Sequence, residues 1–267
     1  MSTTVEQDLA PSPIYTTSEL ASAVADGRVP QWEATAYEEL RAKVADEHFP
    51  CTFGTVALRQ GSILFSYLRQ HDQLRQRGLA TTAERIAEPV AALLAAYALR
   101  LASMPSVVAS MTPLAIFIRP PDGVDSLDDY QRLSFEILTC LRRLDPEAWP
   151  TTVTEDPDSP DWSFCFAGTA FFVNFKTPAH RARRSRRMQR SFLLLIQARD
   201  GFDILAGDTP HGRRARRIIR EKLTAYDGMA PHPALAHFGT DDNREWRQYF
   251  LPDDNETTIE RCPFHRS

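Results

Sequence analysis

The chain has 267 residues, of which 43% are hydrophobic, 25% charged and 10% aromatic, as in ordinary folded proteins. This composition excludes collagen-like, coiled-coil and disorder-dominated classes. The net charge of −4 gives no overall attraction to nucleic acid or to an anionic membrane. The polar N-terminus is not typical of a signal peptide, and the longest apolar stretch, 89–99, is far shorter than the ~20 residues that a bilayer requires. We therefore expect a cytoplasmic protein with no membrane partner.

We expect residues 1–15 to be disordered and residues 16–267 to form a single compact domain. The first part of that domain predicts, in chain order, a helix from the capping box Thr16–Glu19 to Gly27, a helix over 33–47, a break at 48–54, and a strand over 63–68. The next part predicts a long helix from the capping box Thr81–Glu84 with a kink at Pro89, a strand over 114–118, a helix over 126–144, and an acidic surface loop over 150–161.

The centre of the chain changes character, because short Phe-rich strands follow one another there. Strands are predicted over 162–166, 170–175 and 192–197, with a tight turn at Gly168-Thr169. Thr209-Pro210 then begins a helix to about Tyr226, and the tail is expected to wrap around the domain as ordered chain. Helices and strands alternate unevenly. The predicted class is therefore α+β, with a largely antiparallel sheet and helices packed around it.

The most unusual segment is 177–188, which leaves a hydrophobic strand and contains five arginines but no acidic residue. If Pro178 begins a helix, four side chains project from one face: His180, Arg183, Arg184 and Arg187. One imidazole beside three guanidinium groups suits heme, because iron binds the imidazole and the propionates bind the arginines. The surrounding positive charge also favours the neutral, ligating imidazole. The pattern thus fits heme, with His180 as the metal ligand and the three arginines as cofactor-binding residues.

The residues alone leave other interpretations open. An arginine-rich run is commonly a solvated face, and a basic patch can bind nucleic acid, although no RNA- or DNA-binding motif is present. A second basic stripe lies opposite apolar residues of its own helix and needs no ligand: Arg213, Arg216, Arg217 and Arg220. Acidic residues gather instead in the tail, over 241–260. Either the tail folds over the basic centre, which is the favoured interpretation, or a cationic substrate meets the tail.

The cysteines and the other histidines carry weaker signals. Cys262 could ligate heme iron as a thiolate, but a buried structural cysteine is the favoured interpretation there and at Cys51. The chain has no CxxC pair and no HxxxH or HExxH spacing, which excludes a zinc ribbon, a covalently attached heme and a zincin site. It also has no GxGxxG, P-loop or GxSxG motif, which excludes the common dinucleotide, nucleotide and hydrolase sites.

Three segments together resemble the YqcI/YcgG family, from about Phe49 to the C-terminus. They are Phe49-Pro50-Cys51 followed by 57–61, the Phe-rich strand that leads to Pro178 and Ser185-Arg186, and the closing Cys262-Pro263-Phe264. Each segment is short, and their order and spacing make the combination moderately specific. Members of the family usually have His-Pro at the end of the strand, where this chain has Thr177-Pro178, so His180 is taken as the displaced ligand.

The resemblance implies a monooxygenase that depends on heme b and hydroxylates a guanidino nitrogen of L-arginine to N-hydroxy-L-arginine in antibiotic biosynthesis, with O2 as co-substrate. It also implies an external electron donor, because oxygen activation at heme consumes two electrons. Glu245, Trp246 and Asp253 are then the predicted substrate-binding residues, since carboxylates pair with a guanidinium and an aromatic ring stacks on it. A non-catalytic heme-binding protein and an N-oxygenase of another guanidino or amino compound are the alternatives. Nucleic acid is not an expected partner.

Overall fold

The computed structural model describes residues 13–68, 81–201, 207, 209–237, 239–260 and 262–264. Within these ranges the helices are α2 (Thr17–Ala25), α3 (Gln31–Ala45), α4 (Thr52–Gln60), α5 (Thr82–Ala102), α6 (Ser106–Ser110), α7 (Leu127–Leu144), α9 (Pro210–Asp227) and α10 (Trp246–Tyr249). The strands are β1 (Tyr15–Thr16), β2 (Leu64–Leu68), β3 (Leu114–Ile118), β4 (Phe164–Phe166), β5 (Thr169–Lys176) and β6 (Phe192–Ala198). A short 3-10 helix, η2 (Arg184–Arg186), lies between β5 and β6 in the chain.

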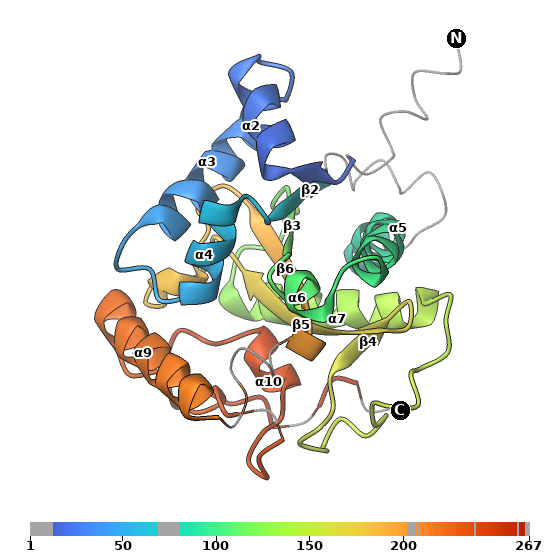
Figure 1. Cartoon of the computed structure of the whole chain (residues 1–267), viewed down its shortest axis with the longest axis vertical. Coiled ribbons are helices and arrows are strands. Elements are labelled where there is room, and N and C mark those ends of the chain that lie inside the picture. The colour runs from blue at the N-terminus through green and yellow to red at the C-terminus, as the bar shows by residue number, and fades with distance from the viewer. Residues whose placement is uncertain are drawn as a thin grey trace.

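The strands form one sheet in the order β1-β2-β3-β6-β5-β4 (Figure 1). β2 and β3 are parallel, and α5 and α6 lie between them in the chain, as a parallel connection requires. The other neighbouring pairs are antiparallel, with Ile116 opposite Leu194 and Val173 opposite Ile196. The fold is therefore α+β with a largely antiparallel sheet, which confirms the predicted class.

Alternating side chains of the central strands enter two hydrophobic clusters, one on each face of the sheet. From β3, Ile116 and Ile118 belong to the cluster of α5 and α7, whereas Ala115 and Phe117 belong to the cluster of α3 and α4. Figure 1 shows α5 and α7 in green on one side of the sheet and α2, α3 and α4 in blue on the other. Over β5, this second face meets α9 and the C-terminal tail instead.

Side-chain capping determines where the predicted helices begin. The side chains of three residues accept a hydrogen bond from the backbone N–H three positions later and complete a capping box: Thr16, Thr81 and Ser126. Pro89 lies inside α5, as expected. β1 begins at Tyr15, which pairs with Phe65, so the predicted disorder is wrong at the end of its segment. Residues 1–12 lie outside the described ranges.

The predicted break at 48–54 is wrong beyond Pro50, because α4 begins at Thr52 with Cys51 as its N-cap. Pro50 precedes this helix rather than interrupting it, and a proline is compatible with such a position. Gly54 disfavours a helix by about 1 kcal/mol relative to alanine, which explains why local preference predicted a break. The short helices α6 and α10 were not predicted either, since five and four residues are too few to show helical periodicity.

The Phe-rich strands of the prediction are confirmed as β4, β5 and β6. The turn between β4 and β5 consists of Ala167 and Gly168, with φ angles of 48° and 70°, one residue earlier than predicted. Two successive residues with positive φ are typical of the type I′ turn that joins twisted antiparallel strands. The predicted helix after Thr209 is confirmed as α9, and it ends at Gly228 in the left-handed conformation.

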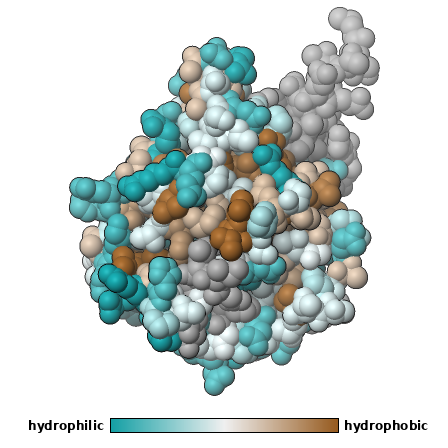
Figure 2. All heavy atoms as spheres, viewed as in Figure 1, coloured by the Kyte–Doolittle hydropathy of each residue, from teal (hydrophilic) through white to brown (hydrophobic). Residues whose placement is uncertain are grey.

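Hydrophobic side chains reach the surface in the middle of the face shown in Figure 2, over α4 and α6. The exposed ones include Val56, Val107 and Val108, which are between 38% and 49% exposed. None of the described helices is both long enough and apolar enough to cross a membrane. The apolar surface of this face is therefore made of isolated side chains on short helices.

Candidate functional site

The basic segment 177–188 is a closed loop, and the predicted helix that starts at Pro178 is wrong. Thr177 N–H donates to Arg186 O and Met188 N–H donates to Thr177 O, so the two ends of the loop meet. A helix of ten residues would separate its ends by about 15 Å, which these bonds do not allow. Only residues 184–186 are helical in this segment, as η2. The four side chains predicted to share a face therefore do not share one.

His180 is fully buried beneath this loop, with 0% of its surface exposed. Its Nδ1 lies 2.9 Å from Thr177 Oγ1, and its Nε2 lies 2.9 Å from Leu251 O. Because a carbonyl oxygen only accepts, Nε2–H donates to Leu251 and Nδ1 accepts from the Thr177 hydroxyl. Burial lowers the pKa of His180 to about 4 against the opposing effect of the Leu251 hydrogen bond. The ring is therefore neutral at pH 7, and both of its nitrogens are used by the protein.

The three arginines predicted to bind a cofactor occupy different environments. Arg183 is 2% exposed and donates to the carbonyl oxygens of Pro252 and Asp254 in the tail. Arg184 is exposed and lies over the Tyr226 ring, with 4.7 Å between its Cζ and the ring centroid. Arg187 is half-buried and forms a β-bridge with Thr177. Of these three arginines, only Arg183 lines the cavity of the site.

The acidic tail folds over the basic segment, which confirms the favoured interpretation of the charge pattern. Asp253 accepts hydrogen bonds from the backbone N–H groups of Arg181 and Arg183, at 2.6 and 2.9 Å. Trp246 is 0% exposed, and its indole N–H donates to Pro157 O. Asp253 and Trp246 thus hold the fold together and do not line the cavity, whereas Glu245 does.

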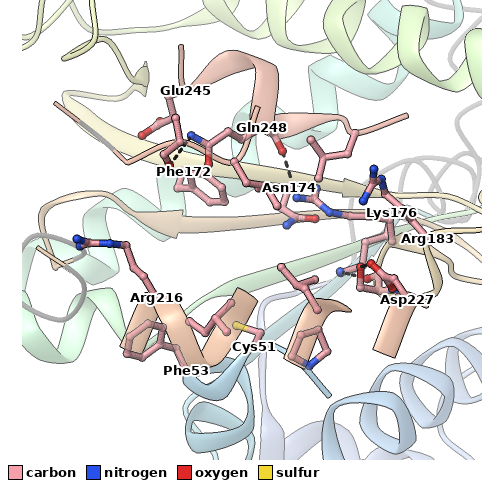
Figure 3. Close-up of a pocket in the computed structure, with 18 of the residues that line it drawn as sticks. Cys51, Phe53, Phe172, Asn174, Lys176, Arg183, Arg216, Asp227, Glu245 and Gln248 are labelled. Atoms are coloured by element: carbon pink, nitrogen blue, oxygen red, sulfur yellow. Dashed lines mark hydrogen bonds between the residues drawn. The ribbon is translucent and has the colours of Figure 1, made fainter. Parts of the chain in front are cut away.

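A cavity of about 270 Å³ lies on the second face of the sheet, between β5, the start of α4, α9 and the tail (Figure 3). This volume is near the lower end of the range for ligand pockets, roughly 300–1,000 Å³. Its lining is mainly apolar and includes Phe49, Phe53, Phe172, Ile219, Leu223 and Leu251. Such a surface excludes water from a bound molecule, so the few polar groups in it decide what binds.

Strand β5 brings polar residues to the cavity by simple alternation. Phe171, Val173 and Phe175 enter the main core, so the residues between them face the other way. Asn174 and Lys176 thereby line the cavity, and Figure 3 shows them across it from Cys51. The Oδ1 atom of Asn174 is buried without a hydrogen-bond partner among the described residues. A buried acceptor of this kind is costly to leave unpaired, so it favours a ligand that donates an N–H or O–H.

Lys176 and Arg186 form a buried cationic region of the cavity wall. Lys176 Nζ donates to Ser185 O at 2.6 Å, and Arg186 Nη2 donates to Gln248 O at 3.2 Å. Arg186 is 6% exposed, and its Nη1 has no hydrogen-bond partner within the described ranges. Burial lowers the pKa of Lys176 to about 7 and that of Arg186 to about 10, because water no longer solvates their charges. A carboxylate would stabilise both groups.

The loop that contains Arg186 is held in place by α9. Asp227, at the end of α9, accepts hydrogen bonds from the backbone N–H and the hydroxyl of Ser185, both at 2.7 Å. The Arg184 guanidinium also donates to Tyr226 O. These contacts fix the backbone on either side of Ser185, and the orientation of the next residue, Arg186, follows from them.

Glu245 lies in the cavity wall away from Lys176 (Figure 3) and is 2% exposed. Its Oε1 accepts from the hydroxyls of Ser163 and Tyr249 at 2.6 and 2.7 Å, and its Oε2 lies 2.9 Å from Arg199 Nε. Burial raises the pKa of Glu245, and Arg199 and the two hydroxyls act in the opposite direction. The carboxylate is thus compensated by the protein before any substrate arrives. A guanidinium that reaches this end of the cavity meets a paired carboxylate.

Cys51 lines the cavity from the N-terminus of α4, and its interpretation as a buried structural cysteine is wrong. Its side chain is exposed, and its Sγ accepts a hydrogen bond from Gly54 N–H at 3.3 Å. The other three cysteines are buried and do not line the cavity: Cys140, Cys165 and Cys262. Cys51 is therefore the one soft metal donor among the cysteines that a molecule in the cavity can reach.

Sequence reasoning missed Asn174, Lys176 and Arg186 as cavity residues. A signal for the first two existed, because polar residues two apart in a Phe-rich strand share one face. No comparable local signal existed for Arg186, which is one of five arginines in its segment. Within the described ranges, no three His, Cys, Asp or Glu side chains come together in a way that would hold a metal ion. A metal in this site would thus need most of its ligands from a cofactor or from solvent.

Comparison with known proteins places these features in a family. The sequence profile of the YqcI/YcgG family matches residues 40–265. A Streptomyces lavendulae protein named "Putative N(omega)-hydroxy-L-arginine synthase DcsA" is 33% identical over 237 residues, which cover 87% of this chain and 84% of that protein.

Two proteins of Bacillus subtilis (strain 168), "Uncharacterized protein YcgG" and "Uncharacterized protein YqcI", are 37% and 33% identical over 241 residues, which cover 88% of this chain and 89% of each. No solved structure matches the chain significantly. The profile match includes all the segments that line the cavity, from Phe49 to Leu251. The chain is therefore a member of the YqcI/YcgG family.

Proposed function

We propose that this protein is a heme-dependent monooxygenase that hydroxylates a nitrogen of a guanidino or amino compound, with L-arginine as the first candidate substrate. The similarity to a protein named as an N-hydroxy-arginine synthase supports an enzyme of this kind. The single observation that carries the proposal is a largely apolar cavity in which two buried polar atoms, Asn174 Oδ1 and Arg186 Nη1, have no hydrogen-bond partner among the described residues.

The residues around His180 do not fit heme binding, whereas those of the cavity do. Both nitrogens of His180 are used by Thr177 and Leu251, and the ring is fully buried. The cavity offers instead the features that a heme site combines: apolar walls for the macrocycle, cations for the propionates, and the thiol of Cys51 as a donor to iron. The expected heme is therefore assigned to the cavity, and the expected ligand His180 is not.

Polar groups of the cavity can recognise the two ends of an amino acid. Arg186 and Lys176 suit carboxylates, from the α-carboxylate of a substrate or from a heme propionate. Asn174 Oδ1 accepts an N–H, and Glu245, paired with Arg199, places a carboxylate in the wall at the other end of the cavity. Together these groups would orient a nitrogen of the substrate within a site from which the apolar walls exclude water.

The overall reaction balances only with an external reductant. One atom of O2 enters an N–H bond to give N–OH, the other leaves as water, and two electrons and two protons are consumed. Heme, when bound, supplies the oxygen chemistry, and the protein supplies binding and orientation. An electron donor is therefore part of the proposal, as is O2 as co-substrate.

The test is a heme titration followed by turnover of the loaded protein. We expect purified protein to bind one heme per chain and, with O2 and a chemical reductant, to convert L-arginine into a product one oxygen atom heavier, detected by mass spectrometry. Agmatine, which lacks the α-carboxylate, measures how much the cationic region contributes. Arg186→Met should raise KM for L-arginine more than for agmatine, and Arg190→Met, at an exposed position outside the cavity, should change neither.

Two results would change the conclusion. A protein that binds heme but forms no N-hydroxy product from guanidino or amino compounds would be a heme-binding protein without this activity. A protein that takes up no heme would refute the proposal.

A further inference from the structure

We propose that Cys51 is the axial ligand of the heme iron, through its thiolate sulfur. This inference rests on the proposed function in one respect only, the presence of heme in the cavity. The sequence favoured a structural role for Cys51 and selected His180 as the ligand, so this proposal replaces His180 with Cys51.

The sulfur of Cys51 lies at the N-terminal end of α4. Cys51 precedes Thr52, the first residue of α4, so its side chain sits at the N-terminal end of a nine-residue helix. Gly54 N–H donates to Sγ at 3.3 Å. The N-terminal end of a helix carries partial positive charge, and this end together with the N–H donor stabilises a negatively charged sulfur. The same side chain is exposed and faces the cavity.

Gly54 leaves space beside the sulfur of Cys51. A Cβ added to Gly54 would lie 3.4 Å from Cys51 Sγ and 3.8 Å from Phe49 Cε1. A methyl group at position 54 would therefore be in ordinary van der Waals contact with the sulfur and with Phe49. Glycine leaves the space on this side of the sulfur open, at some cost in helix stability.

Buried cations in the wall of the same cavity support this assignment. Arg186 is more than nine-tenths buried, lines the same cavity, and has an Nη1 atom without a partner among the described residues. Burial lowers the pKa of Arg186 and of Lys176, and a negative charge on the Cys51 sulfur acts in the opposite direction on both. The cavity thus combines a sulfur donor for iron with buried cations that suit a carboxylate, and a heme propionate or the substrate would supply that carboxylate.

The step itself is a proton-for-metal exchange. The Cys51 S–H bond breaks, its proton passes to solvent, and an Fe–S bond forms without any change in the oxidation state of the iron. No oxidant or reductant is needed. His237 is the nitrogen donor that also lines the cavity, so it is the alternative that the test must separate from Cys51.

The test uses the full chain loaded with heme, and its readout is spectroscopic. We expect the reduced protein with carbon monoxide to show the strongly red-shifted Soret band of thiolate-ligated heme. Cys51→Ser should lose this band and weaken heme binding at least tenfold, and Cys51→His should bind heme with the band of imidazole ligation. Cys140→Ser, at a buried cysteine outside the cavity, and His237→Ala should both keep the thiolate band.

A further variant guards against loss of fold. Gly54→Ala keeps the thiol and adds only a van der Waals contact to it, so the thiolate band should persist, while circular dichroism of the heme-free protein verifies that each variant folds. A thiolate band that persists in Cys51→Ser, or an imidazole band in the unaltered protein, would overturn the assignment and leave the proposed function standing. Heme bound through Cys51 without N-hydroxylation would refute the proposed function alone, and absence of heme binding would refute both.

Discussion

Replacement of Lys176 with methionine tests whether the cavity wall contains a buried ammonium group. Burial lowers the pKa of Lys176 from 10.5 to about 7. In the unfolded chain the lysine keeps its ordinary pKa, so between pH 7 and 10.5 the unfolded state binds a proton that the folded state does not. Stability must then rise with pH across this interval, because the cost of burying the charge disappears as the folded group loses its proton.

The magnitude follows from the two pKa values. One pKa unit is worth about 1.4 kcal/mol, so the full effect is about 5 kcal/mol, of which about 2.5 kcal/mol falls between pH 6 and pH 9. The free energy of unfolding of the unaltered protein, measured by urea denaturation, should rise by that amount relative to Lys176→Met. Comparison with the variant removes the contributions of all other titrating groups, since both proteins share them.

The control is Lys222→Met, since the Lys222 ammonium donates to Glu47 O and does not line the cavity. This variant measures how much the loss of a lysine side chain outside the cavity changes the stability. Parallel stability curves for Lys176→Met and the unaltered protein between pH 6 and 9 would refute the reasoning. A carboxylate ligand adds a second test, because it should restore the charge of Lys176 and flatten the slope.

Three other residues give predictions that unfolding measurements or proteolysis can check. Burial lowers the pKa of His180 from 6.5 to about 4, so the unfolded chain takes up a proton that the folded chain does not. The free energy of unfolding should therefore fall by about 3 kcal/mol more than that of His180→Gln as the pH falls from 7 to 4. An equal fall in both proteins would contradict the hydrogen bonds assigned to His180. Glu245→Gln should cost about 3–5 kcal/mol in urea denaturation, because the buried Arg199 guanidinium loses the charge of Glu245, and adding Arg199→Met should recover part of the loss. No recovery would argue against a contribution of this ion pair to stability. Arg183→Lys should lower the free energy of unfolding by about 2–3 kcal/mol and speed limited proteolysis of the tail over 248–255, because an ammonium cannot make all the hydrogen bonds of the guanidinium. An unchanged cleavage rate would show that other contacts hold the tail.

The helix caps and strands were predictable because they depend on residues close together in the chain. Thr81 and Glu84 are three positions apart and form their capping box whatever the rest of the fold does. The Phe-rich strands follow from composition, and the alternation of β5 already placed Asn174 and Lys176 on one face. The motifs at Phe49-Pro50-Cys51 and Cys262-Pro263-Phe264 likewise indicated the family, because such motifs are short runs of adjacent residues.

The predicted helix and shared face at 177–188 are wrong because partners from distant parts of the chain decide the conformation of that segment. The ring nitrogen of His180 donates to Leu251, 71 residues away, and the Arg183 guanidinium binds tail carbonyls at a similar separation. Local spacing favoured a helix there and could not include these partners. For Cys51 the error was the opposite one. The sequence predicted a buried structural cysteine, because no residue near Cys51 in the chain indicates that a cavity lies beside it.

By itself, the sequence determined the longer helices, the strands, the fold class and the family, because hydrogen bonds between close neighbours and hydrophobic periodicity act over a few residues. Tertiary structure decided which polar groups are paired and which face an open cavity. Burial raises the cost of every unpaired group, and whether His180 or Arg186 finds a partner depends on chain that returns from 60 or more residues away. Contacts at that distance therefore decide which polar groups remain available to a ligand.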